Sequence, residues 1–249
     1  MKNIAQVAVL TLLILGCKEN KKNDAAKEEV VVESEMTPSD DEWTMIFDGE
    51  TFDGWHEYLK QDVSDNWKIE DGAMVLYPPE SRENKEQFNI VTDDTFTDFV
   101  LSLDWKISEA GNSGVMWGVE EIEDLGQPYL TGPEVQVLDN EKHPDGKNGT
   151  SHQSGALYDM VSPSEDATKP VGEWNTMVIT INHKTNEGNV VLNGIEVVDF
   201  PVNDPEWKEM VANSKFADWE HFAKYPTGKI ALQDHGNGVA FRNIKIKEL

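Results

Sequence analysis

The chain is nearly devoid of cysteine and short of positive charge. Its single cysteine, Cys17, excludes an internal disulfide, so the fold must be stabilised by its hydrophobic core. Lysine and arginine number 21 against 47 aspartate and glutamate residues, which gives a formal net charge of −26. Because a surface of that charge repels nucleic acids and anionic lipids, we expect neither as a partner.

Several functional motifs are also missing from the sequence. It contains no glycine-rich phosphate loop, no cysteine and histidine spacing typical of a zinc site, and no internal repeat. These absences disfavour nucleotide binding and a structural zinc site. The acidic composition instead suits an exported protein that acts on neutral solutes.

Long hydrophobic runs are absent except near the N-terminus. Residues 4–15 form an apolar run that is too short for a permanent membrane span but fits the core of a signal peptide. Residues 14–17, Ile-Leu-Gly-Cys, overlap the end of this run and resemble a bacterial lipobox, in which Cys17 becomes the acylated N-terminus after cleavage. We therefore expect residues 1–16 to be a signal peptide, with an uncleaved anchor as the alternative. The lipid on Cys17 would be the only membrane contact and would hold the protein at the outer membrane of the cell envelope.

Two segments follow the signal peptide. Residues 17–40 comprise the acylated cysteine and a polar stretch without aromatic residues, a composition expected of a flexible tether. Residues 41–249 contain all eight tryptophans and are long enough for one large domain.

The domain has the sequence pattern of an all-β fold. About a dozen short runs alternate between apolar and polar residues, and the alternation is cleanest in residues 101–107. Asn193-Gly194 and Asp71-Gly72 are typical of tight hairpin turns, because these residues tolerate positive φ angles. We expect a two-sheet jelly-roll sandwich. One short helix is expected within residues 204–215, where Pro205 suits the first turn.

The strand expected at residues 134–138 carries an unusual pair of polar side chains. Val135 and Val137 supply its apolar face, so the alternation of a strand places Glu134 and Gln136 together on the other face. That face is either the solvated outside of an ordinary strand or a ligand-binding surface, and we favour the second. Asp139 belongs to the opposite face unless a β-bulge returns it to the side of Glu134.

Further polar and aromatic candidates surround this strand. His152 and His235 are the histidines best placed for acid–base or metal chemistry, although each could be structural. The remaining candidates for substrate binding, each with a structural alternative in a turn or in the core, are Asn112, Gln233, Trp117 and Trp219.

The motifs of the domain occur in the order found in a known family. They lie at residues 46–55, 112–114, 132–139, 155–158, 172–175, 191–194 and 232–244. On these motifs the chain from about Glu42 to Leu249 resembles the 3-keto-disaccharide hydrolase domain family of exported bacterial proteins.

The resemblance implies a concanavalin-A-like jelly roll that acts on glycosides oxidised at C3. A ketone at C3 acidifies the C2 hydrogen, so a base can remove it and expel the C1 substituent, after which water adds to the enone. Glu134 with His152 or His235 can fill the proton-transfer roles. Gln136, Asn112 or a bound divalent metal ion could polarise the C3 carbonyl, so the cofactor stays open.

Two other functions remain open from the sequence. Retaining β-glucanases of the laminarinase type carry a Glu-x-Asp-x-x-Glu strand, whose spacing is matched here by Glu134, Gln136 and Asp139 with two changed residues. A non-catalytic carbohydrate-binding module would use the same face without turnover. In each case the expected partner is a carbohydrate.

Overall fold

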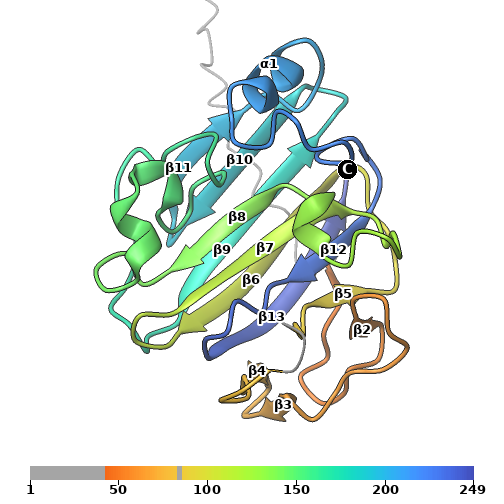
Figure 1. Cartoon of the computed structure of the whole chain (residues 1–249), viewed down its shortest axis with the longest axis vertical. Helices are drawn as coiled ribbons and strands as arrows, with labels where there is room; N and C mark the ends of the chain where they lie inside the picture. Colours follow the sequence, from red (N-terminus) through yellow and green to blue (C-terminus); the bar gives the residue numbers. More distant parts are fainter. Residues whose placement is uncertain (1–42, 83–85) are drawn as a thin grey trace, which may run out of the picture. The chain divides into compact units, whose positions relative to one another are not determined.

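The computed structural model of the chain describes residues 43–82 and 86–249 (Figure 1). The predicted signal peptide, the lipidation site at Cys17 and the tether lie outside the described residues and stay predictions. In the described part of the chain, no helix has both the length and the apolar character needed to cross a bilayer.

The larger of two antiparallel sheets has eight strands. In spatial order they are β11 (Ile195–Phe200), β10 (Glu187–Leu192), β9 (Asn175–Asn182), β6 (Phe99–Ile107), β13 (Val239–Glu248), β4 (Ala73–Leu76) and β3 (Trp67–Glu70), with β1 (Thr44–Met45) also pairing with β13. The predicted alternation is visible along β6, where Phe99, Leu101, Leu103, Trp105 and Ile107 are buried and the residues between them are partly exposed.

The smaller sheet has five strands and carries the candidate site. Its spatial order is β2 (Trp55–Glu57), β5 (Ile90–Thr92), β12 (Lys229–Leu232), β7 (Asn112–Val119) and β8 (Glu134–Leu138). The short strands β2 and β5 were not among the strands predicted from the sequence. β7 begins at Asn112, so it includes a glycine-containing stretch whose sequence suggested a segment leading into the strand.

One hydrophobic core joins the two sheets. Val135 and Val137 of the five-stranded sheet belong to the same buried cluster as Leu101 and Leu103 of the eight-stranded sheet. The protein is therefore an all-β sandwich of two sheets, as predicted. The opposite face of the five-stranded sheet carries a second, smaller apolar cluster that includes Met116 and Ala231.

Both predicted hairpin turns are present. Asn193 and Gly194 have φ angles of 51° and 85° and join β10 to β11, and Asp71 and Gly72 have φ angles of 50° and 74° and join β3 to β4. Positive φ at both central residues matches the right-handed twist of the flanking strands.

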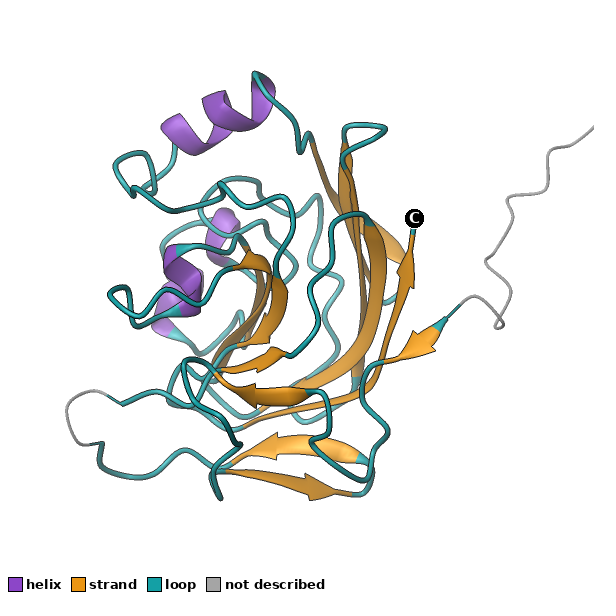
Figure 2. Ribbon diagram, turned by 90° about the vertical axis from the view of Figure 1, so that its right-hand side faces the viewer, coloured by secondary structure: helices purple, strands orange, loops and turns teal. Residues whose placement is uncertain are grey.

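The helical segments gather on one side of the strands (Figure 2). The predicted helix is α1 (Glu206–Ala212), and its Trp207 and Met210 side chains pack against the core. Three short 3₁₀ helices, η3 (Pro128–Leu130), η4 (Pro144–Lys147) and η5 (Thr150–His152), flank β8 in the sequence.

Candidate functional site

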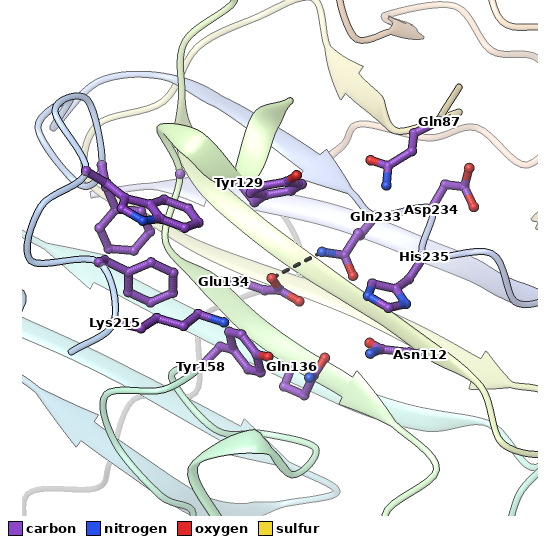
Figure 3. Close-up of a pocket in the computed structure, with 14 residues that line it drawn as sticks. Gln87, Asn112, Tyr129, Glu134, Gln136, Tyr158, Lys215, Gln233, Asp234 and His235 are labelled. Atoms are coloured by element: carbon purple, nitrogen blue, oxygen red, sulfur yellow. Dashed lines mark hydrogen bonds between the residues drawn. The ribbon is translucent and has the colours of Figure 1, made fainter. Parts of the chain in front are cut away.

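A pocket opens on the face of the five-stranded sheet that points away from the core. It encloses about 200 Å³. Its lining residues come from β7, β8, the turn after β12, the segment after α1, and the loops that precede β5, surround η3 and follow η5. They are Gln87, Asn112, Tyr129, Gly132, Glu134, Gln136, Tyr158, Lys215, Phe216, Trp219, Phe222, Gln233, Asp234 and His235 (Figure 3). Six of the sequence-predicted site residues are in this set: Glu134, Gln136, His235, Asn112, Gln233 and Trp219.

Strand alternation places Glu134 and Gln136 in the pocket. Val135 and Val137 are fully buried in the core, so their neighbours project to the opposite face. The antiparallel register pairs Gln136 with Gly114 of β7, and it pairs Glu134 with Met116. The predicted ligand-binding face is therefore the face that holds the pocket.

The absence of a side chain at Gly114 makes room for the Glu134 side chain. A β-carbon built at Gly114 would lie 2.6 Å from Cγ of Glu134 and closer still to its carboxylate. Because real β-carbons do not approach another atom so closely, any larger residue at this position would displace Glu134.

Burial raises the pKa of Glu134 to about 8. The residue is only 8% exposed, and transfer of its carboxyl group out of water disfavours the charged form. The Lys215 ammonium and a hydrogen bond donated by Gln233 Nε2 to Oε2 at 3.2 Å oppose this rise only partly. At neutral pH most of the Glu134 side chains are therefore protonated.

His235 lies at the exposed rim of the pocket, and its pKa is lowered. Partial removal of its ring from water is the main cause, and the neighbouring imidazole of His143, with ring centroids 5.9 Å apart, adds to it. Since the ordinary pKa of histidine is about 6.5, the ring is neutral at pH 7. Glu134 and His235 thus have pKa shifts in opposite directions, as in acid–base pairs of enzymes.

Two buried amide oxygens in the pocket lack hydrogen-bond partners among the described residues. They are Oδ1 of Asn112 and Oε1 of Gln233. Buried polar atoms are paired in the great majority of cases, so these two acceptors are available to hydroxyl groups of a ligand or to water. Gln136 uses its amide oxygen to accept the Val137 N–H at 3.1 Å, and its amide NH₂ group can still donate.

Aromatic rings form the opposite side of the pocket. This aromatic wall consists of Tyr129, Tyr158, Phe216, Trp219 and Phe222. Phe216 stacks on Phe222 with centroids 3.9 Å apart, and Trp219 packs edge-on against Phe216 at 5.0 Å. Flat apolar rings opposite convergent amide groups suit a ligand with one apolar and one hydroxylated face.

His152 does not line the pocket, contrary to the prediction that it converges with Glu134. Its Nδ1 contacts Asp145 Oδ1 at 3.0 Å and its Nε2 contacts Asp159 Oδ1 at 3.1 Å. The ring lies behind Tyr158, with centroids 4.7 Å apart, and the Tyr158 hydroxyl donates to Asp145 Oδ2 at 2.8 Å. Both ring nitrogens contact carboxylates, so His152 supports the lining residue Tyr158 from behind and does not itself line the pocket.

Asp139 and Trp117 are also absent from the pocket. The Asp139 carboxylate accepts hydrogen bonds from the backbone N–H groups of Ala110, Glu141 and Lys142, so it fixes turns and no bulge returns it to the side of Glu134. Trp117 packs in the core at 5.8 Å from Phe200 and borders a different cavity beneath α1. Strand alternation and core packing explain both placements.

The described residues do not include a group of three histidine, cysteine, aspartate or glutamate side chains arranged to hold a metal ion. Glu134, Asp234 and His235 are the lining residues that could contribute ligands to one, and the Asp234 carboxylate is already paired with Arg82.

Several pocket residues were not predicted from the sequence. Lys215, Phe216 and Phe222 reach the pocket only because the segment after α1 folds over the sheet. One signal was available, because Phe216 and Phe222 fall, with the predicted Trp219, within a short acidic stretch that has no strand pattern. Aromatic residues in such a stretch need a surface to pack on.

Comparison with known proteins identifies relatives over nearly the whole chain. The family model described as 3-keto-alpha-glucoside-1,2-lyase-like domain matches residues 42–247. A 3-keto-disaccharide hydrolase of Bacteroides thetaiotaomicron is 32% identical, over 95% of this chain and 94% of the relative.

Solved structures agree with this relationship. A crystal structure from Parabacteroides distasonis, provisionally described as a glycosyl hydrolase, is 31% identical, has a TM-score of 0.75, and is matched over 84% of this chain and 94% of its own. A second structure from the same organism with the same description is 25% identical, with a TM-score of 0.62 over 83% of this chain and 99% of its own.

Proposed function

This chain belongs to the 3-keto-alpha-glucoside-1,2-lyase-like family, and we propose that it cleaves glycosides whose sugar carries a ketone at C3. The relationship supports a glycoside-hydrolase-type activity on a carbohydrate. The finer proposal has three steps: removal of the C2 proton, elimination of the C1 substituent, and addition of water to the resulting enone. Because a hydroxyl group then replaces the C1 substituent, the net reaction is hydrolysis.

The observation that carries this proposal is the charge state of two pocket residues. At neutral pH Glu134 holds a proton and His235 does not, because their pKa values are shifted in opposite directions. Elimination needs a base for the C2 proton and an acid for the departing oxygen in the same site. The neutral imidazole of His235 is the base, and the carboxyl group of Glu134 is the acid.

The protons balance over one turnover. His235 takes the C2 proton, the electron pair of the C–H bond forms the enolate, and the enolate expels the C1 oxygen, which receives the proton of Glu134. The Glu134 carboxylate then removes a proton from the water that attacks C1. The protonated His235 returns its proton to C2, so both residues regain their starting states.

The remaining pocket residues bind and orient the sugar. The unpaired amide oxygens of Asn112 and Gln233 accept hydrogen bonds from sugar hydroxyl groups. The amide NH₂ group of Gln136 donates to the C3 carbonyl. Trp219 and the rest of the aromatic wall contact the apolar C–H face of the ring or its substituent.

A retaining β-glucanase mechanism lacks a required group in this pocket. It needs two carboxyl groups that flank the scissile bond. Among the lining residues only Glu134 and Asp234 carry them, and Asp234 is fully buried in a two-pronged ion pair with Arg82, at 2.5 and 2.8 Å. Asp139, which matched the spacing of the second carboxylate, lies outside the pocket.

The proposal is tested by comparing a 3-keto-glucoside with its unoxidised parent, each carrying the same chromogenic aglycone. We expect aglycone release from the ketone alone, because only the ketone acidifies C2, and a loss of about 100-fold or more in Glu134→Gln. Equal release from both substrates would contradict the elimination and favour direct hydrolysis. Saturable binding without release would favour a carbohydrate-binding module.

A further inference from the structure

Lys215 is the only lysine or arginine among the described residues that line the pocket. It follows α1 in the segment that carries Phe216, Trp219 and Phe222 of the aromatic wall. Its side-chain ammonium forms no salt bridge with a carboxylate of the described residues, whereas Lys60, Lys142 and Lys208 each pair with at least one. In a chain with a formal charge of −26, an unpaired cation at a pocket is available for a charge that arises in a ligand.

Contacts of its side chain and of its backbone both fix the position of Lys215. Its Nζ lies 3.9 Å from the ring centroid of Tyr158 and 5.1 Å from that of Phe216, distances at which aromatic faces attract a cation. Its backbone N–H donates to Asp159 Oδ2 at 2.7 Å, and the other oxygen of Asp159 contacts His152. The carboxylates behind Tyr158 therefore hold both the ring and the lysine in place.

The charge of Lys215 acts inside the pocket. Its ammonium lowers the pKa of Glu134 against the effect of burial, so its field reaches the carboxyl group. Figure 3 shows the Lys215 amine pointing toward Glu134 and Tyr158. Lys215 is itself an exposed residue, but the carboxyl group on which its charge acts is buried, where the effective dielectric constant is lower than in water.

We propose that Lys215 is a further catalytic residue, which stabilises the negative charge that develops on the C3 oxygen when the C2 proton leaves. This inference rests on the proposed function. The C–H bond at C2 breaks, its proton goes to His235, and the electron pair moves through C2 and C3 onto the carbonyl oxygen. The pair then returns to form the C1–C2 double bond as the C1–O bond breaks.

Lys215 is the lining residue that already carries a positive charge when the C2 proton leaves, whereas His235 becomes positive only by taking that proton. The leaving oxygen is neutralised by the Glu134 proton, whereas the C3 oxygen gains a charge with no proton to match it. Gln136 can donate only a neutral hydrogen bond, while Lys215 stays protonated throughout and is neither consumed nor regenerated. Preorganised charges of this kind account for a large part of enzymatic rate enhancement.

The test compares two substitutions at Lys215 with a matched control. Lys215→Met keeps the length of the side chain and removes the charge, and Lys215→Arg keeps the charge. Lys224→Met removes an exposed lysine that borders the cavity beneath α1 and does not line the pocket. Initial rates with a 3-keto-glucoside give kcat and KM for each variant, and melting temperatures show that each is folded.

We expect Lys215→Met to lower kcat about 100-fold with KM changed by less than about threefold. Lys215→Arg should recover at least about tenfold of that loss, and Lys224→Met should match the wild-type protein. A kcat of Lys215→Met within about threefold of wild type, or equal losses in the Met and Arg variants, overturns the inference and leaves the proposed function intact. A wild-type protein that does not cleave the 3-keto-glucoside overturns both.

Discussion

Gly114 and Glu134 occupy adjacent strands, and the missing side chain of the glycine is the space into which the carboxylate fits. A β-carbon at Gly114 would come within 2.6 Å of Glu134 Cγ. The glycine pairs with Gln136 across the ladder, so the Glu134 side chain leans over its neighbour on β7. The position of the pocket acid therefore depends on a residue that carries no chemistry of its own.

Gly114→Ala should lower kcat for 3-keto-glycosides by about 10- to 100-fold, because the added methyl group displaces Glu134 from its productive position. The matched control is Gly238→Ala, where a β-carbon would meet its nearest neighbours at 3.7 Å or more, an ordinary contact. Steady-state rates of the two variants provide the comparison. Equal activity of Gly114→Ala and the control would show that the position of Glu134 does not limit turnover.

Glu134 should make the protein less stable as the pH rises from about 4.5 to about 8. In this range the folded protein holds one proton more than the unfolded chain, so the free energy of unfolding decreases with pH. Glu134→Gln removes this proton uptake. We expect the variant to be more stable than wild type at pH 9 by about 2–5 kcal/mol, and the difference to fade toward pH 4.

Urea unfolding of both proteins at several pH values measures this difference. A stability difference that does not change with pH would mean that the pKa of Glu134 in the folded state is close to its ordinary value.

The predictability of this site from sequence varies among its residues. Alternation within β8 was sufficient to place Glu134 and Gln136 together, and the two-residue turn at Asn193-Gly194 identified its hairpin. Such features depend on neighbours in the chain. Asp139 followed the spacing of a known catalytic strand, but its carboxylate serves backbone N–H groups of a turn, which spacing alone does not reveal.

Residues from distant segments were harder to predict. Lys215 reaches the pocket because the segment after α1 folds over the five-stranded sheet, and no periodicity in the sequence encodes that contact. The same reason explains the error for His152. Its polar, glycine-containing surroundings suggested a reactive histidine, whereas Asp145 and Asp159 from the folded loop occupy both of its nitrogens.

The two histidines should respond differently to the same substitution. His235→Gln removes the proposed base from the pocket and should lower kcat by about 100-fold or more. His152→Gln breaks contacts with Asp145 and Asp159 behind Tyr158, so we expect a loss of about tenfold with an unchanged pH profile. The rates of both variants, measured across the pH range, distinguish these two roles. A larger loss of kcat in His152→Gln than in His235→Gln would indicate that His152 acts as the base.

The pH dependence of kcat/KM should be bell-shaped. Activity rises with pH as His235 loses its proton, at a pKa below the ordinary 6.5. It falls as Glu134 loses its proton near pH 8. Because each limb belongs to one residue, Glu134→Gln should remove the alkaline limb from its residual activity. An alkaline limb that persists in this variant would assign it to another group.

Removal of the C2 proton is the central step of the account, and a substrate deuterated at C2 tests it most directly. The 3-keto-glucoside carrying deuterium at C2 is incubated with the protein in ordinary water, and the released 3-keto sugar is analysed by mass spectrometry at early times. The free deuterated product, treated in the same way, corrects for exchange after release. We predict slower aglycone release than from the undeuterated substrate, together with loss of C2 deuterium in those turnovers in which protonated His235 exchanges with water before it returns a proton to C2. Full retention of deuterium with equal rates would show that the C1–O bond breaks without proton removal at C2, and would contradict the account.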